Sequence, residues 1–327
     1  MKHNRKQFLT TEFYLLVFLA VVLVFLGIFA KGFYSVNNIM SILNVYSYVL
    51  ISAIGMNMII LTGNIDVSTG ALISVVCLVI AAIGKLGATF PVLLITAMAV
   101  GMLLSAFNAF FITKLKIPAI VATLATTQIF QGSLTLAVEG SIYDLPATYT
   151  WLAFKAKVFG IIPFSFVMCV IITVIALLFM KYSRFSKKIY AVGNSTESAR
   201  LTGINVNRTV FLTYVIAGAL FGVSGVIVGT AGQRVTTTMG SGLEMTFIAA
   251  VVLGGTSTAG GSGRVLGTVI GALILASISS AITYLGISTN WADFIKGAII
   301  LISVLVSALR TIKRMRTIPG KAGVQAS

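Results

Sequence analysis

Very few residues of this chain are of a type that could do chemistry, and most of them stand alone in apolar surroundings. The single histidine, His3, lies in a polar N-terminal tail. The two cysteines, Cys77 and Cys169, lie in apolar segments with no Cys or His at metal-ligand spacing. No Gly-x-x-x-x-Gly-Lys-Ser/Thr sequence is present, so the chain lacks the loop that cradles nucleotide phosphates. We therefore expect no catalytic residue, no metal site and no cofactor of the chain's own.

The ionisable residue that most needs an explanation is Asp66. It is the only acid in the predicted membrane region of the first half away from a terminus. An isolated charge at membrane depth is costly, so such a residue pairs, faces water or marks a solute path. Asp66 could instead cap a helix by accepting hydrogen bonds from the backbone of Ser68 or Thr69. Four amides in apolar segments could likewise line a hydrophilic path or join helices: Asn57, Asn108, Gln128 and Gln131.

Asp66 stands in one of two glycine-rich, polar interruptions of the apolar sequence, at 61–70 and 253–264, each beside a short apolar segment. Broken helices of this kind place backbone polar groups along a solute path near the bilayer midplane in transporters built from internal repeats. The alternative is that the glycines only allow helices to pack closely. The residues predicted to line the path are Asn64, Asp66, Ser68, Asn108, Gly254, Gly255, Thr256 and Gly261.

The elements that must position these residues are membrane helices. Apolar residues make up 58% of the chain and charged residues 9%, and about 20 apolar residues suffice to cross a bilayer. We predict ten such segments, at 13–30, 45–62, 71–86, 90–112, 118–137, 161–180, 210–231, 245–254, 265–285 and 291–309. They fill nearly the whole chain, which predicts one transmembrane domain over 1–327. Its polar parts are a tail at 1–12, a cytoplasmic loop at 181–209 and a basic tail at 310–327. The first segment has full span length and no cleavage pattern after it, so we expect it to be retained.

The positions of the basic residues predict the orientation. With a cytoplasmic N-terminus, 17 of the 23 Lys and Arg residues fall on the inner side, five fall outside, and Lys296 lies within the last span. The positive-inside rule therefore places both termini in the cytoplasm. It also accounts for the net charge of +16, since most of these cations face anionic lipid headgroups. No basic cluster is interleaved with aromatic residues, so a nucleic-acid partner is not expected.

In this topology the first five spans and the last five run in opposite senses. The short segments 71–86 and 245–254 are each third in their half and lie beside an interruption. We therefore predict an all-α integral membrane protein with about ten transmembrane helices in two inverted five-helix repeats, including short, broken helices.

The loop at 181–209 carries a second pattern. Asn194 and Glu197 have the spacing of a capping pair, residues 195–202 suit two helical turns, and Gly203 suits a left-handed stop. This predicts a short helix exposed to the cytoplasm, which is a suitable lever for a soluble partner. The alternative is a connector that lies on the membrane surface.

Three motifs together resemble the permease subunits of ribose-type bacterial ATP-binding cassette importers. The sequence Gly-Asn-Ile-Asp-Val-Ser at 63–68 resembles the family's Gly-Gly-Ile-Asp-Leu-Ser, 193–205 resembles its coupling loop, and 252–263 resembles its late glycine motif. Asn108, Lys-Ile-Pro at 116–118 and Thr-Leu at 123–124 also fit, so the likeness covers roughly 40–310. Two positions depart from the family pattern: Asn64 replaces its second glycine, and Ser198 replaces an alanine that helices favour slightly more.

The resemblance implies a bacterial inner-membrane permease for a small sugar or sugar-like solute. A separate cytoplasmic ATP-binding cassette subunit would use the ATP and dock on the coupling loop. A soluble extracytoplasmic protein would deliver the solute, and a second permease copy or a homologous permease would complete the channel. The family's coupling pattern falls on Gly193, Asn194, Glu197, Ala199 and Gly203.

Two other classes of protein remain open. An ion-coupled secondary transporter also uses inverted repeats, but it normally requires an ion or proton site. This chain offers few acids for one, namely Asp66, Asp293 and Glu244, and no buried histidine. A membrane scaffold would have no use for paired broken segments.

Overall fold

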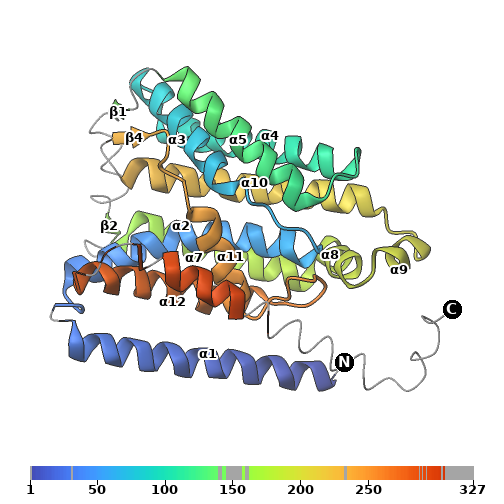
Figure 1. Ribbon diagram of the computed structural model, residues 1–327, viewed down its shortest axis with the longest axis horizontal. Coiled ribbons are helices and arrows are strands. Elements are labelled where there is room, and N and C mark those ends of the chain that lie inside the picture. Colours follow the sequence, from blue (N-terminus) through green and yellow to red (C-terminus); the bar gives the residue numbers. More distant parts are fainter. Residues whose placement is uncertain are drawn as a thin grey trace.

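The computed structural model of the protein describes residues 2–30, 32–138, 142–144, 157–158, 162–231, 234–286, 288, 290–291, 293–302 and 305. Most of these residues are helical. The helices are α1 (Lys2–Phe29), α2 (Val36–Leu61), α3 (Thr69–Lys85), α4 (Phe90–Thr113), α5 (Ala119–Ala137), α7 (Phe164–Tyr182), α8 (Arg184–Asn194), α9 (Thr196–Leu201), α10 (Val206–Ala231), α11 (Leu243–Leu253) and α12 (Val265–Tyr284). Residues 293–302 are also helical. Figure 1 shows that the axes of the long helices are roughly aligned.

Seven described helices are long and apolar enough to cross a membrane: α1, α2, α4, α5, α7, α10 and α12. Two apolar helices, α3 and α11, are shorter, with 17 and 11 residues. The predictions of a multi-pass helical protein and of short helices at 71–86 and 245–254 are therefore confirmed. The tenth predicted segment, 291–309, lies partly outside the described residues. Helix α1 begins at Lys2, so most of the predicted N-terminal tail continues the first helix, because nothing in it breaks one.

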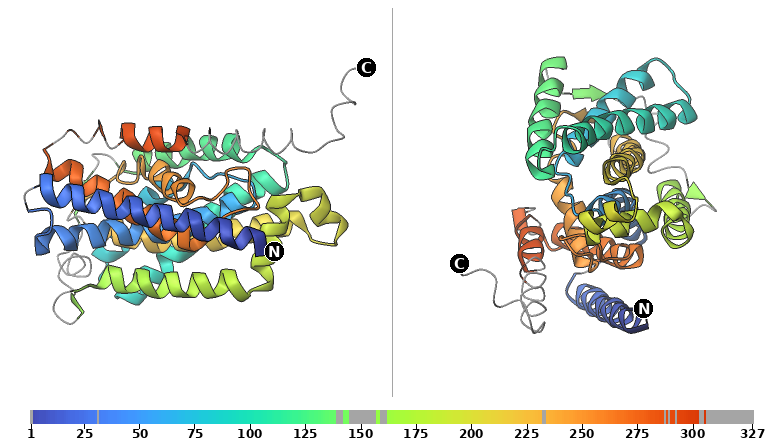
Figure 2. Two further views of the ribbon diagram at one scale, coloured as in Figure 1. Left: turned by 90° about the horizontal axis from the view of Figure 1, so that it is seen from below. Right: turned by 90° about the vertical axis from the view of Figure 1, so that its right-hand side faces the viewer.

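Helices α2 and α10 form the centre of the bundle. Two thirds of each apolar window is buried, against 11% for α1, which lies at the edge beside α12 (Figure 2). Small residues let α10 approach α4: a Cβ on Gly218 would overlap the backbone of Gly101, and one on Gly222 would overlap that of Ala97. Close approach through small residues is the usual way in which helices associate in a membrane.

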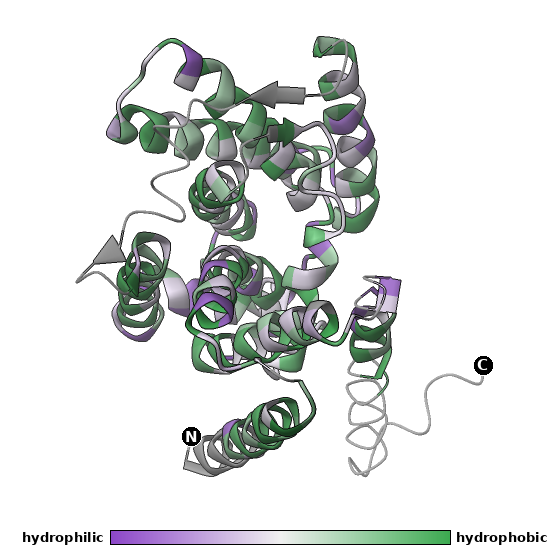
Figure 3. Ribbon diagram, turned by 90° about the vertical axis from the view of Figure 1, so that its left-hand side faces the viewer, coloured by the Kyte–Doolittle hydropathy of each residue, from purple (hydrophilic) through white to green (hydrophobic). Residues whose placement is uncertain are grey.

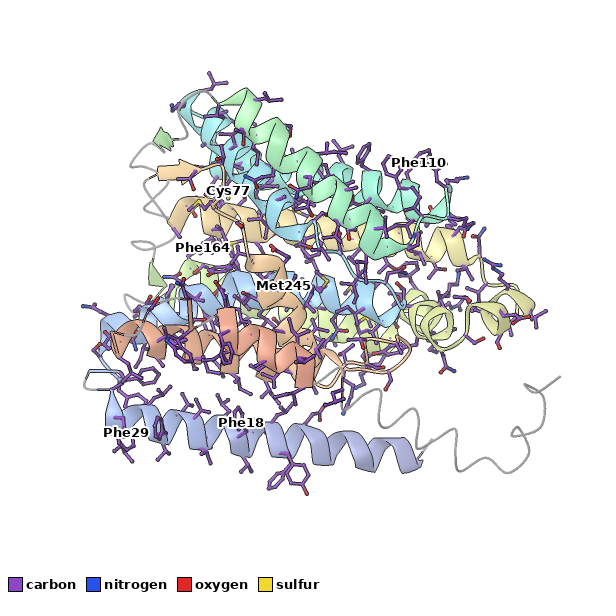
Figure 4. All side chains as sticks on the ribbon, in the orientation of Figure 1. Phe18, Phe29, Cys77, Phe110, Phe164 and Met245 are labelled. Carbon is purple, nitrogen blue, oxygen red and sulfur yellow. The ribbon has the colours of Figure 1, made fainter. Side chains whose placement is uncertain are left out.

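The outer surface of the bundle is apolar. Figure 3 shows hydrophobic residues along the outward sides of the peripheral helices, and Figure 4 labels Phe18 and Phe29 on α1. Their side chains are exposed, as are those of Leu103 on α4 and Ile175 on α7. Because these residues face away from the core, they suit contact with lipid.

The two ends of the bundle differ. One end carries four short strands, β1 (Ile142–Asp144), β2 (Lys157–Val158), β3 (Ile162–Pro163) and β4 (Arg234–Thr236). β1 pairs antiparallel with β4, and β2 with β3. The all-α prediction thus omitted two small ladders, which form because connecting segments still need partners for their backbone groups. The other end carries α8, α9 and the start of α1 (Figure 1).

Candidate functional site

Three glycine-containing segments that are far apart in the sequence meet at the end of the bundle that carries α8 and α9. The amide of Gly261 donates a hydrogen bond to the carbonyl of Leu61, with N and O 2.9 Å apart. A Cβ on Gly193 would overlap this same carbonyl. A Cβ on Gly260 would stand 2.7 Å from the amide nitrogen of Gly63. We call Gly63, Gly193, Gly260 and Gly261 the glycine junction; it joins the predicted coupling loop to both predicted interruptions through backbone contacts.

Helices α8 and α9 form the arm that extends from this junction. The predicted capping pair of Asn194 and Glu197 is wrong: Asn194 ends α8, and the Oγ of Ser195 accepts the amide hydrogen of Ser198, 3.2 Å away. Serine takes the role because its backbone is extended there, as an N-cap requires. Glu197 is exposed on the first turn of α9.

The predicted left-handed stop at Gly203 is confirmed, with a φ of +81°. The amide of Gly203 donates to the carbonyl of Arg200, and the amide of Ile204 donates to the carbonyl of Ala199. These two hydrogen bonds form the Schellman motif that ends many helices. Ala199 is buried, so α9 turns this residue toward the bundle and its polar residues outward.

A second set of contacts holds α8 against the segment that follows α11. The hydroxyl of Tyr190 donates to the carbonyl of Gly263, 3.0 Å away. Burial raises the pKa of Tyr190, and the nearby positive charge of Arg264 opposes that rise. Arg264 also pairs with Glu12 of α1 at 3.0 Å, which brings the first helix to the same end. The arm is therefore fixed to the rest of the bundle on two sides.

The first interruption is held by side chains from three elements. The Oδ1 of Asp66 accepts the backbone amide of Ser68 at 2.9 Å and its hydroxyl at 2.6 Å. The amide group of Asn108 on α4 donates to the hydroxyl of Ser68 at 2.6 Å. The backbone amide of Val67 donates to the hydroxyl of Thr123 on α5. The predicted contact of Asp66 with the backbone before α3 is confirmed, and Asp66, Ser68 and Asn108 lie together as one network.

The second interruption is held by α2. The amide of Asn57 donates to the hydroxyl of Thr256, 3.1 Å away, and to that of Thr268 on α12. Gly254 lies against the backbone of Gly267, where a Cβ would come within 2.6 Å. Asn57 thus joins helices, which is one of the two roles that the sequence left open. Gln131 instead joins α5 to the turn before α11, by donating to the carbonyl of Thr237 at 3.0 Å.

One close approach was not predicted from the sequence. Gly70, at the start of α3, lies against Gly240 and the carboxylate of Glu244, at the start of α11. The hydroxyl of Ser74 accepts the amide hydrogen of Gly240 at 2.8 Å. Gly242 has a φ of +81°, which glycine adopts readily. The signal in the sequence was the polar, glycine-rich run at 238–242 before the short apolar segment.

The two interruptions therefore meet at one place, and the far end of the first contacts a different segment. Gly260 and Gly261 of the second contact the first at Gly63 and Leu61, next to α8. Gly70, at the far end of the first, meets the segment before α11 rather than the one after it. The remaining predicted path residues do not gather in one place: Thr256 belongs to the contacts with Asn57, and Asn64 hydrogen-bonds only locally to Thr62.

A cavity of about 390 Å³ opens beside the glycine junction. It lies between the first interruption, α4, α9 and the start of α10, and Asn64, Lys116, Gly193 and Arg200 line it among others. Lys116 is the one described residue other than glycine with a positive φ, +60°, and its Nζ donates to the side-chain oxygen of Asn207. The described residues contain no group of three or more His, Cys, Asp and Glu side chains that could hold a metal ion.

Comparison with known proteins gives the class of this chain. Residues 38–304 match the family described as "Branched-chain amino acid transport system / permease component". The match covers most of the chain, so the protein belongs to this family of transport permeases.

Curated proteins that are similar to this chain include sugar and autoinducer permeases by name. The chain is 33% identical to the ribose import permease protein RbsC of Escherichia coli (strain K12) over 89% of its own length and 92% of the relative's. It is 34% identical to RbsC of Bacillus subtilis (strain 168), over 88% and 90%. It is 32% identical to the autoinducer 2 import system permease protein LsrC of Escherichia coli O9:H4, over 88% and 84%. No solved structure matches the chain.

Proposed function

We propose that this chain is the membrane-spanning permease subunit of an ATP-binding cassette importer. It carries a small sugar or sugar-like solute across a bacterial inner membrane, and both its termini lie in the cytoplasm. Its ten spans form two inverted repeats of five, in which α3 and α11 are the short third helices. A separate ATPase subunit supplies the energy, a soluble protein delivers the solute, and a second permease copy or a homologous permease completes the path.

The glycine junction is the observation that carries this proposal. It places the arm formed by α8 and α9 in direct backbone contact with both interruptions. Backbone atoms cannot escape a neighbour by changing rotamer, so a displacement of the arm moves Leu61 and Gly261 with it. A transporter driven by a soluble ATPase requires such a connection between its docking loop and its solute path.

The orientation is supported by the residues at the α8 and α9 end. Four exposed basic residues lie on α8 and α9: Arg184, Lys187, Lys188 and Arg200. Arg264 and the start of α1 share this end. The clustering of basic residues at one end of the bundle is the pattern that the positive-inside rule assigns to the cytoplasm.

The solute class rests on the relatives and on the polar residues of the interruptions. Two of the relatives are named for ribose and one for autoinducer 2. Asn64 and Thr256 offer an amide and a hydroxyl group, and a neutral polyol needs no opposite charge along its route. The two repeats would bring these groups to a path shared with the second permease.

The test is ATP-driven uptake. The permease is purified in mild detergent with the ATPase subunit that copurifies with it, reconstituted into vesicles and supplied with the soluble protein that delivers the solute. We expect labelled ribose or a related sugar to enter when ATP is present, after an ionophore has collapsed all ion gradients. An ion-coupled transporter would behave in the opposite way: uptake without an ATPase subunit, or uptake that the ionophore stops while ATP is present, would refute the proposal.

A further inference from the structure

Four buried oxygen atoms beside the first interruption have no hydrogen-bond partner among the described residues. They are Oδ2 of Asp66, Oγ of Ser105, Oδ1 of Asn108 and the hydroxyl of Tyr214. Each of these residues has a relative exposure of 0%. We propose that these four oxygens form a binding site for one monovalent cation of the size of Na⁺.

The hydrogen bonds around Asp66 fix which atoms are left over. The hydroxyl of Ser68 donates to Oδ1 of Asp66, so its oxygen can only accept from Asn108. Asn108 must therefore present its NH₂ group to Ser68, and its carbonyl oxygen points elsewhere. Ser68 supplies both hydrogen bonds of the Asp66 carboxylate, and both go to Oδ1, which leaves Oδ2 without a partner among the described residues.

The packing of α4 on α10 brings the residues that carry the other two oxygens to the same level of the bundle. The helices are antiparallel: Gly222 faces Ala97, and Gly218 faces Gly101 and Ser105. One further turn brings Tyr214 to the level of Ser105 and Asn108, on the face of α10 that Gly218 presents to α4. The charge of Asp66 also acts on the hydroxyl of Tyr214.

The charge balance favours a cation over a water molecule. The ion pairs found among the described residues join Arg264 to Glu12 and Lys296 to Asp293, so neither neutralises Asp66. A water molecule could satisfy four hydrogen-bonding atoms, but Asp66 would then have to bind a proton to lose its charge, because an unpaired charge in the interior is strongly destabilising. A cation satisfies the same oxygens and removes the charge.

The ligand set indicates which cation. All four atoms are oxygens, which suit hard cations, and a single carboxylate balances a single positive charge. Asp66 lies in the non-helical segment between α2 and α3, and unwound segments of this kind coordinate Na⁺ in other transporters. The bound ion would fix the interruption against α4 and α10. It is a structural ion in this proposal and is not carried with the solute.

The experiment uses the purified full-length permease alone, so its result is independent of the proposed transport function. The midpoint of thermal unfolding is measured against NaCl, KCl and choline chloride at constant ionic strength. We expect a saturable rise with Na⁺, a smaller rise with K⁺ and none with choline, because only binding to the folded state stabilises it. Binding of ²²Na⁺ to the same protein, displaced by unlabelled Na⁺, gives a second readout.

Variants locate the site. Asp66→Asn should abolish the dependence on Na⁺. Tyr214→Phe and Ser105→Ala, which remove only a hydroxyl, should weaken Na⁺ binding about tenfold each, the effect of losing about 1.4 kcal/mol. Tyr46→Phe is the matched control, because the hydroxyl of Tyr46 donates to the carbonyl of Val269 elsewhere in the bundle; it should leave the Na⁺ midpoint unchanged.

The outcomes that overturn the proposal are equally direct. They are equal unfolding midpoints in NaCl and choline chloride, stronger stabilisation by K⁺ than by Na⁺, or full Na⁺ dependence in Tyr214→Phe and Ser105→Ala. If Asp66→Asn does not fold, these two hydroxyl variants decide the question by themselves.

Discussion

Gly193→Ala tests the glycine junction most directly. A methyl group at this position would stand 2.5 Å from the amide nitrogen of Gly261, whereas ordinary contacts begin at 3.4 Å. It would also overlap the carbonyl of Leu61. The two backbones must therefore separate by about 0.9 Å or more, which disrupts the 2.9 Å hydrogen bond between Gly261 and Leu61.

The energetic cost follows from these contacts. Overpacking costs about 1–3 kcal/mol, and a lost backbone hydrogen bond costs roughly 1 kcal/mol more. The higher helix propensity of alanine offsets up to about 1 kcal/mol of this cost, because residue 193 lies within α8. We expect a net destabilisation of about 1–3 kcal/mol, together with a displaced arm. The expected phenotype is normal membrane insertion, a lowered unfolding midpoint and ATP hydrolysis that no longer drives uptake.

Gly132→Ala and Gly297→Ala are matched controls, since a Cβ at either helical position would meet no atom within 4 Å. Thermal unfolding in detergent and ATP-driven uptake in vesicles are measured for all three variants. The control variants should match the parent or exceed it slightly in stability. The reasoning is refuted if Gly193→Ala matches the parent protein in both unfolding midpoint and coupled uptake.

Two further predictions concern the arm and the path. Gly203→Val places a β-branched residue at a φ of +81°, which strains the end of α9 by about 1–2 kcal/mol. Coupled uptake should be lost while membrane insertion stays normal. An unchanged uptake rate would show that α9 does not couple ATP hydrolysis to transport. Single cysteines introduced after both native cysteines are replaced by Ala should react with a small hydrophilic thiol reagent at Asn64 and Thr258, which are partly exposed. Ser68 and Thr256 are buried, so cysteines at these positions should react only when ATP is trapped. A lack of labelling at all four positions in both states would show that the interruptions do not line the solute path.

Sequence reasoning placed most of the spans within about four residues, because the bilayer itself dictates their length and composition. It started α2 nine residues too late, at 45 and not at Val36, because the polar residues of its first turns interrupt the apolar pattern. The short helices α3 and α11 were predicted to within two residues at each end, since the flanking glycines interrupt the apolar pattern sharply. Helix α8 was missed because its basic residues made 181–209 look like a loop. Its buried face is small, consisting of Ser186, Ile189 and Val192.

The site was predicted less completely than the helices. The individual glycines were visible, but their contacts join residues up to 200 positions apart, from Leu61 to Gly261, and hydrophobicity patterns carry no such information. The approach of Gly70 to Gly240 and Glu244 was missed for the same reason. The network of Asp66 was predicted only in its local part, the hydrogen bond to Ser68; its contact with Asn108 depends on how α4 packs.

These contacts make the first interruption a segment that is held at both ends. At one end Gly63 lies in the glycine junction, which moves with the arm. At the other end Asp66 and Ser68 are bound to Asn108, and therefore to the closely packed pair of α4 and α10. A displacement of α9 cannot be absorbed at the junction, because its contacts are between backbone atoms. It must instead change the few residues between 63 and 66, where no helix resists it. That short segment is where we expect docking of an ATPase to alter the solute path.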